Sequence, residues 1–266
     1  MSVTPRFKAT AAEGRAALVG YLPAGFPSVA ASIEAMRVLI DSGCDIIEVG
    51  MPYSDPVLDG PVIQRATQDA LSRGFRTKDA MRIVEAVSGN GVPIVVMTYW
   101  NPVEKYGVEA FSRDLAAAGG SGLITPDLIP EEAHEWLAAS DAHDLDRIFL
   151  VAPSSTQERI SQTVAVSRGF VYAQSIMGVT GVRDQTSQAA PSLVARTREA
   201  TRLPIGVGLG VRNRDHARAV AQYADAVIVG SAMISCLQDH DDEADAMRRL
   251  SELTRELRDG ASAPTA

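Results

Sequence analysis

The sequence predicts an α/β protein that folds as a single (β/α)8 TIM barrel. Eight short β-rich runs alternate with longer amphipathic stretches. Most of these runs are continuously apolar, which indicates strands covered on both faces, as in a parallel sheet. No low-complexity linker interrupts the 266 residues, and such barrels routinely occupy about 250 residues as one domain. We expect the barrel domain to span residues 1–257, and residues 258–266, rich in small and polar residues, to form a flexible C-terminal tail.

The predicted strands are short, buried in character and separated by helical stretches that require right-handed crossovers. The clearest helices are residues 28–40, with apolar side chains at helical spacing before Gly43, residues 112–118, which end at a Gly pair, and residues 212–221, which follow a glycine-rich turn. In chain order, the predicted strands are residues 17–22, 46–49, 94–98, 122–125, 147–151, 170–173, 205–207 and 226–229.

Charge and cysteine content exclude several classes of protein. Lys and Arg total 25 against 33 Asp and Glu, and the net charge of -8 argues against nucleic-acid and membrane partners. Cys44 and Cys236 are far apart and have no companion ligands, so neither a disulfide framework nor a zinc site is expected. Residues 1–10 lack the apolar core of a signal peptide, and no apolar run could span a membrane, so we expect a cytoplasmic protein.

Active sites of such barrels lie on the loops at the carboxyl ends of the strands. Near that end of the second strand, Glu48 interrupts an apolar run and shares a face with Ile46. A carboxyl group that faces the barrel interior loses solvation, which raises its pKa and suits it to proton transfer near neutral pH. The alternative is a Glu paired with an Arg or hydrogen-bonded in the core. Asp45, at the start of the same strand, is predicted to serve stability.

A long loop, residues 50–64, follows this strand and carries two acids, Asp55 and Asp59. Asp59 precedes Gly60 and Pro61, and proline suits the first turn of a helix. Asp59 is therefore either a functional acid or a turn or capping residue ahead of that helix. The apolar residues 56–58 either contact a partner or fold back on the barrel.

Glycine-rich turns end the seventh and eighth predicted strands. One contains Gly208 and Gly210, and the other is Gly230-Ser231. Turns without side chains let backbone N–H groups converge, and a helix N-terminus adds positive potential, so barrels often bind phosphate there. The alternative is ordinary left-handed turns with Ser231 as a helix cap. Residues 178–181 form a third loop that could donate N–H groups.

Lysine and histidine positions argue against two aldolase mechanisms. The only lysines are Lys8, Lys78 and Lys105, and none falls at a strand end, so a Schiff-base nucleophile is missing. The four histidines have no metal-ligand spacing, so no metal site is predicted. Acid–base chemistry by carboxyl groups on a phosphorylated substrate remains.

These motifs together resemble one family. The segment DIIEVGMPYSDPVLDGPVIQ at residues 45–64, with GVTG at 178–181, GLG at 208–210 and GS at 230–231, resembles the α subunits of tryptophan synthase. The likeness covers about residues 20–237, and the first segment is highly specific. The resemblance implies a lyase of L-tryptophan biosynthesis that cleaves indole-3-glycerol phosphate to indole and glyceraldehyde 3-phosphate, with no metal or organic cofactor in this subunit.

The resemblance also implies roles for individual residues. Glu48 matches the catalytic acid–base carboxylate, and Asp59 matches the second catalytic acid, which hydrogen-bonds the indole N–H. Tyr172 is expected beside the indole, and Thr180 in a mobile loop that closes toward Asp59. The residues expected to bind the phosphate, largely through backbone N–H groups, are Gly181, Gly210, Gly230 and Ser231.

The partner implied by the resemblance is a β subunit that uses pyridoxal phosphate and forms an α2β2 heterotetramer with this chain. The lysine positions give this chain no usual means of binding that cofactor covalently. Asp55 and Pro56 are the predicted partner interface, and closure of the Thr180 loop would signal through them.

Some points stay open at the level of sequence. Tyr21 and Tyr99 either line the pocket or pack at strand ends. Some family members carry an Arg before the GVTG loop where this chain has residues 175–177, SIM. The rival functions are another phosphate-binding barrel, such as a sugar-phosphate isomerase or epimerase, and a non-catalytic barrel that binds ligand and activates a partner.

Overall fold

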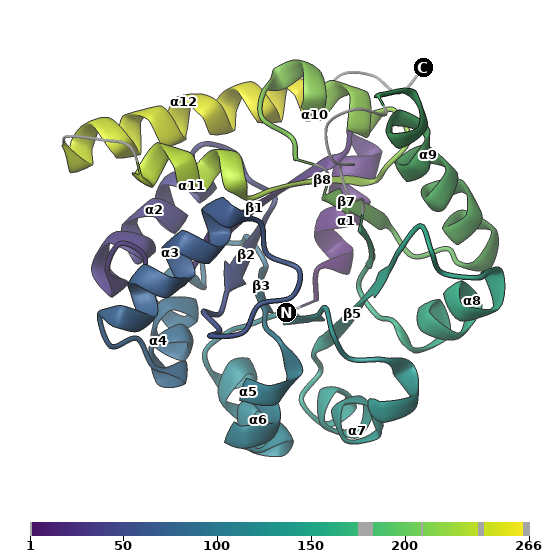
Figure 1. Cartoon of the computed structure of the whole chain (residues 1–266), viewed down its shortest axis with the longest axis horizontal. Helices are drawn as coiled ribbons and strands as arrows, with labels where there is room; N and C mark the ends of the chain where they lie inside the picture. Colours follow the sequence, from purple (N-terminus) through teal and green to yellow (C-terminus); the bar gives the residue numbers. More distant parts are fainter. Residues whose placement is uncertain (1, 175–182, 209, 239–241, 263–266) are drawn as a thin grey trace.

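The computed structural model of the chain describes residues 2–174, 183–208, 210–238 and 242–262. Its strands pair in chain order, all parallel, and β8 closes on β1, so the predicted (β/α)8 barrel is confirmed (Figure 1). The strands are β1 (Ala17–Pro23), β2 (Ile46–Gly50), β3 (Ile94–Met97), β4 (Gly122–Thr125), β5 (Asp146–Val151), β6 (Val171–Gln174), β7 (Ile205–Gly208) and β8 (Ala226–Val229).

Helices surround the barrel and cover the outer faces of the strands (Figure 1). The predicted helix at 28–40 begins one residue later because Ser28 is its N-cap and accepts a hydrogen bond from the Ala31 N–H. The helix predicted at 112–118 begins four residues earlier, at Val108. The helices are α1 (Thr4–Ala12), α2 (Val29–Asp41), α3 (Pro61–Ser72), α4 (Thr77–Val87), α5 (Trp100–Tyr106), α6 (Val108–Ala117), α7 (His134–Ala142), α8 (Gln157–Val166), α9 (Arg183–Ala200), α10 (Arg214–Ala221), α11 (Ser231–Gln238) and α12 (Glu243–Ala261), with a 3-10 turn η1 (Pro130–Glu132).

A separate apolar core fills the inside of the barrel. Phe7 of α1 enters it from the amino ends of the strands and contacts Phe170, with ring centroids 5.5 Å apart. Burial of these side chains supplies the hydrophobic free energy that holds α1 against the barrel. The inside of the barrel is therefore packed at the amino ends of the strands. The members of this core are Val3, Phe7, Ala17, Val19, Ile46, Val95, Ile124, Ile148, Phe170, Ala226 and Ile228.

Asp45 anchors the amino end of β2, as predicted. Its buried carboxylate accepts hydrogen bonds from Arg15 at 2.7 and 2.9 Å and from the Leu18 N–H at 2.9 Å. The paired guanidinium and carboxylate satisfy each other in a site where an isolated charge would be costly. Asp45 thus ties the start of β2 to the start of β1.

The predicted start of a flexible tail at Arg258 is wrong. Helix α12 continues to Ala261, which is fully buried and accepts a hydrogen bond from the Ala16 N–H at 3.1 Å. A Cβ at Gly260 would collide with the Arg214 carbonyl, so the small residues let α12 approach α10 closely. Small side chains here mark tight helix packing rather than a loose end; residues 263–266 lie outside the described ranges.

Within the described ranges, none of the helices is long and apolar enough to cross a membrane.

Candidate active site

Glu48 lies in the middle of β2, opposite Tyr21 of β1 and Val95 of β3. Its side chain is buried, with 1% exposed, and its Oε2 atom has no hydrogen-bond partner in the described part of the chain. An arginine partner, the alternative for this residue, is not found among the described residues. An unpaired carboxyl oxygen inside a protein is costly, and such groups are typical of functional sites.

The environment of Glu48 holds its carboxyl group in the protonated form. Desolvation by burial is the main cause that raises its pKa from 4.5 to about 8, and the charge of Asp59 adds to the shift. At neutral pH the group therefore carries a proton that it can donate. It can also take a proton back, because its pKa lies close to the working pH.

Asp59 belongs to the loop between β2 and α3. Gly60, not Asp59, is the N-cap residue of α3, so the capping interpretation of the Asp59 side chain is wrong. Burial raises the pKa of this carboxyl group, and a hydrogen bond with the Tyr99 hydroxyl partly opposes that shift. The Tyr99 hydroxyl also accepts a hydrogen bond from the Leu58 N–H at 3.0 Å, which holds the loop over the barrel.

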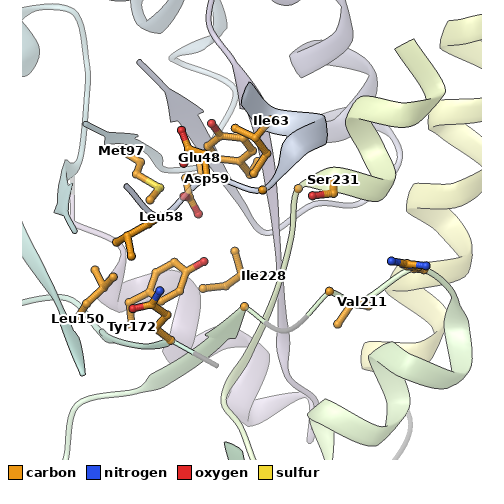
Figure 2. Close-up of a pocket in the computed structure, with 17 residues that line it drawn as sticks. Glu48, Leu58, Asp59, Ile63, Met97, Leu150, Tyr172, Val211, Ile228 and Ser231 are labelled. Atoms are coloured by element: carbon orange, nitrogen blue, oxygen red, sulfur yellow. The ribbon is translucent and has the colours of Figure 1, made fainter. Parts of the chain in front are cut away.

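A cavity of about 320 Å³ opens above the interior core and contains both acids. Figure 2 shows Glu48 and Asp59 together on one side, Tyr172 and Leu150 on another wall, and Ser231 and Val211 away from the acids. The lining residues are Tyr21, Glu48, Leu58, Asp59, Gly60, Ile63, Met97, Leu150, Tyr172, Gln174, Gly208, Gly210, Val211, Arg212, Ile228, Gly230 and Ser231.

Two tyrosines fit the cavity walls because glycines face them. A Cβ at Gly50 would collide with the Tyr21 ring, and a Cβ at Gly208 would collide with the Tyr172 hydroxyl. Desolvation raises the pKa of both phenols well above the usual value, and the nearby carboxyl groups add to it, so both stay neutral. Both side chains line the cavity, and the place of Tyr172 beside the indole stays a prediction.

The glycine-rich turns also meet at this cavity. Gly210 has a left-handed backbone (φ 51°), so the interpretation of this segment as an ordinary left-handed turn is correct. The residue also lines the cavity. Ser231 is the first residue of α11. Gly230 precedes it and accepts a hydrogen bond from the Ile234 N–H at 3.0 Å. Thr180 and Gly181 lie outside the described residues.

Asp55 and Pro56 lie in the same loop as Asp59 but outside the cavity lining. Of the two alternatives for residues 56–58, folding back on the barrel is correct for Leu58, and contact with a partner stays a prediction. Leu58 folds back to line the cavity, whereas the Val57 side chain is 76% exposed. In the described ranges, no group of three or more His, Cys, Asp or Glu side chains could hold a metal ion.

Sequence reasoning missed most of the apolar wall and one cation. Leu150 could have been found, because alternate residues of β5 point into the barrel. Loop residues such as Val211 and Arg212 carry no such signal. The missed lining residues are Ile63, Met97, Leu150, Gln174, Val211, Arg212 and Ile228.

The fold and the cavity together define a (β/α)8-barrel enzyme with two neighbouring carboxyl groups in the lining of its cavity. Comparison with known proteins gives a more specific assignment. The family model described as "Tryptophan synthase alpha chain" matches residues 7–262. The chain is similar to the tryptophan synthase alpha chain of Mycobacterium marinum, with 62% identity over 96% of this chain and 93% of that protein.

Solved structures agree with this assignment. A tryptophan synthase structure from M. tuberculosis superposes with a TM-score of 0.91 and 59% identity, covering 98% of each chain. The subunit alpha structure from Legionella pneumophila gives a TM-score of 0.90 at 29% identity, covering 98% of each chain.

The chain belongs to the tryptophan synthase α chain family, whose members are lyases that cleave indole-3-glycerol phosphate to indole for the β subunit. The family and the activity predicted from the sequence are confirmed.

Proposed function

We propose that Glu48 and Asp59 carry out the cleavage of indole-3-glycerol phosphate in this cavity. The bond to be broken joins indole C3 to the first carbon of the glycerol chain. Protonated Glu48 donates its proton to C3, which places positive charge on the ring nitrogen. The resulting Glu48 carboxylate then takes the proton from the adjacent hydroxyl as the carbon–carbon bond breaks, releasing indole and glyceraldehyde 3-phosphate. The observation that carries this proposal is the buried carboxyl group of Glu48, whose Oε2 atom has no hydrogen-bond partner among the described residues and whose pKa is about 8.

Asp59 stabilises the intermediate in this proposal. Its carboxylate accepts a hydrogen bond from the indole N–H and offsets the positive charge that develops on the ring. Its neighbour Tyr99 supports the role, because the phenol hydrogen bond favours the ionised carboxylate against desolvation.

The rest of the cavity suits the two ends of this substrate. Leu150, Ile228 and Tyr172 offer apolar surface for the flat indole ring. Gly210, Gly230 and Ser231 lie where backbone N–H groups and the start of α11 could hold the phosphate. Thr180 and Gly181 are proposed to complete the site, as the resemblance implies.

We also propose that indole passes to a β subunit in an α2β2 complex in the cytoplasm, with pyridoxal phosphate held by that partner. Asp55 and Pro56 are the proposed contact. Two exposed apolar side chains support this end of the barrel as the interface: Val57 after β2, 76% exposed, and Ile129 after β4, 47% exposed. Parallel strands bring their following loops to the same end of the barrel.

Indole release from indole-3-glycerol phosphate, with and without an added β subunit, tests the proposal. Asp59→Asn keeps the size of the side chain but removes the charge, and we expect cleavage to fall about 10²-fold or more while ligand binding survives. Asp55→Asn, in the same loop outside the cavity, is the matched control for the isolated subunit. Unchanged cleavage by Asp59→Asn would favour the non-catalytic barrel instead.

A further inference from the structure

The lining of the cavity includes one cation, Arg212, that takes no part in the proposed proton transfers. Arg212 follows Gly210 by two residues in the loop between β7 and α10. Among the lining residues that the structure describes, the other charged side chains are Glu48 and Asp59. Arg212 is therefore the one described lining residue whose side-chain charge can attract an anion.

Arg212 is available to a ligand. Its side chain is exposed, and the described residues form no hydrogen bond or ion pair with it. Other arginines are held: Arg15 by Asp45 at 2.7 Å and Arg159 by Glu131 at 2.6 Å. An arginine without a partner breaks no existing ion pair when it binds an anion.

Arg212 belongs to the end of the cavity that lies away from the acids. Its chain neighbour Val211 and the start of α11 at Ser231 are separated from Glu48 and Asp59 in the close-up view (Figure 2). This end also carries the glycines of the two turns. A dianion placed there is separated from the two carboxyl groups and lies beside the loop that carries the cation.

We propose that Arg212 binds the phosphate group of the substrate and gives the site its preference for phosphorylated over unphosphorylated indole ligands. This inference rests on the proposed function and extends it to a residue outside the glycine turns. The planar guanidinium can donate two parallel hydrogen bonds to phosphate oxygens. Because the phosphate does not react, the contact is equally strong in substrate and transition state, so losing it raises KM and leaves kcat unchanged.

A pair of ligands tests this role directly: a 3-alkylindole phosphate and the corresponding unphosphorylated alcohol, titrated into the full chain by calorimetry. We expect Arg212→Ala to weaken the phosphate ligand about tenfold, the size of one charged hydrogen bond, and Arg212→Lys to recover part of that loss. The alcohol should bind equally to all variants. Added salt should narrow the difference for the phosphate ligand, because the site is open to solvent.

Arg214→Ala is the matched control, because Arg214 is also exposed but does not line the cavity. We expect its affinity for both ligands to stay within about twofold of wild type. The proposal would be overturned if Arg212→Ala and Arg214→Ala lowered the affinity for the phosphate ligand equally. It would also be overturned if Arg212→Ala lowered the affinity for the alcohol as much as the affinity for the phosphate ligand. If the wild-type chain released no indole but bound the phosphate ligand through Arg212, the proposed function would fail and this inference would stand.

Discussion

Glu48→Gln should slow cleavage strongly and stabilise the fold at the same time. Glutamine keeps the shape of the side chain but can neither give nor take a proton, so we expect kcat to fall about 10²- to 10⁴-fold. In the wild type, the pKa of Glu48 is about 8 in the fold against 4.5 in the unfolded chain. Between these values the folded protein binds a proton that the unfolded chain has released. The free energy of unfolding therefore falls as the pH rises from 4.5 to about 8 and is constant above that.

The magnitude follows from the same pKa values. From 4.5 to pH 7 is about 2.5 pH units, and each unit is worth about 1.36 kcal/mol, so holding this carboxyl group costs on the order of 3 kcal/mol at pH 7. Glutamine avoids that cost, although its amide also lacks hydrogen-bond partners. We therefore expect Glu48→Gln to raise the free energy of unfolding by about 1–3 kcal/mol at pH 7, and by about zero at pH 4.5.

Urea unfolding at pH 5, 7 and 9, together with indole release over the same range, measures both effects. The exposed Glu34 of α2 provides the control, since Glu34→Gln should change stability by less than about 0.5 kcal/mol and leave cleavage intact. Wild-type cleavage should decline above about pH 8 as the Glu48 proton is lost. A Glu48→Gln protein that is less stable than wild type at pH 7, or whose stability difference is the same at every pH, would refute the reasoning.

Three further predictions concern other parts of the molecule. Asp45→Ala removes the buried partner of the Arg15 guanidinium, leaves it only the exposed Glu13, and should lower the free energy of unfolding by about 2–3 kcal/mol, measured in urea, with kcat unchanged. Gly208→Ala forces the Tyr172 hydroxyl to move and should weaken binding of an indole ligand at least several-fold in calorimetry; unchanged affinity would show that the ring shifts freely. The double variant Val57→Ser, Ile129→Ser should weaken association with a β subunit without slowing cleavage by the isolated chain; equal association would move the interface elsewhere.

The strands and Glu48 were predictable from the sequence because a buried parallel strand must be continuously apolar, so a single acid within one is conspicuous. Strand bounds agree within one residue at either end of each strand. The end of α12 was not predictable, because composition alone does not distinguish the small residues of a tight helix contact from those of a loose segment. Gly208 and Tyr172 fit together across two strands, and Arg212 lines the cavity from an irregular loop. Neither contact produces a periodic pattern in the sequence, so neither could be predicted from it.

The apolar core that Phe7 forms with the side chains around it limits how substrate and product can enter and leave the barrel. Because these side chains fill the amino end of the barrel, substrate and product cannot pass through that end. A protein that receives the aromatic product without releasing it to bulk water must therefore bind at the opposite end, where the loops follow the carboxyl ends of the strands.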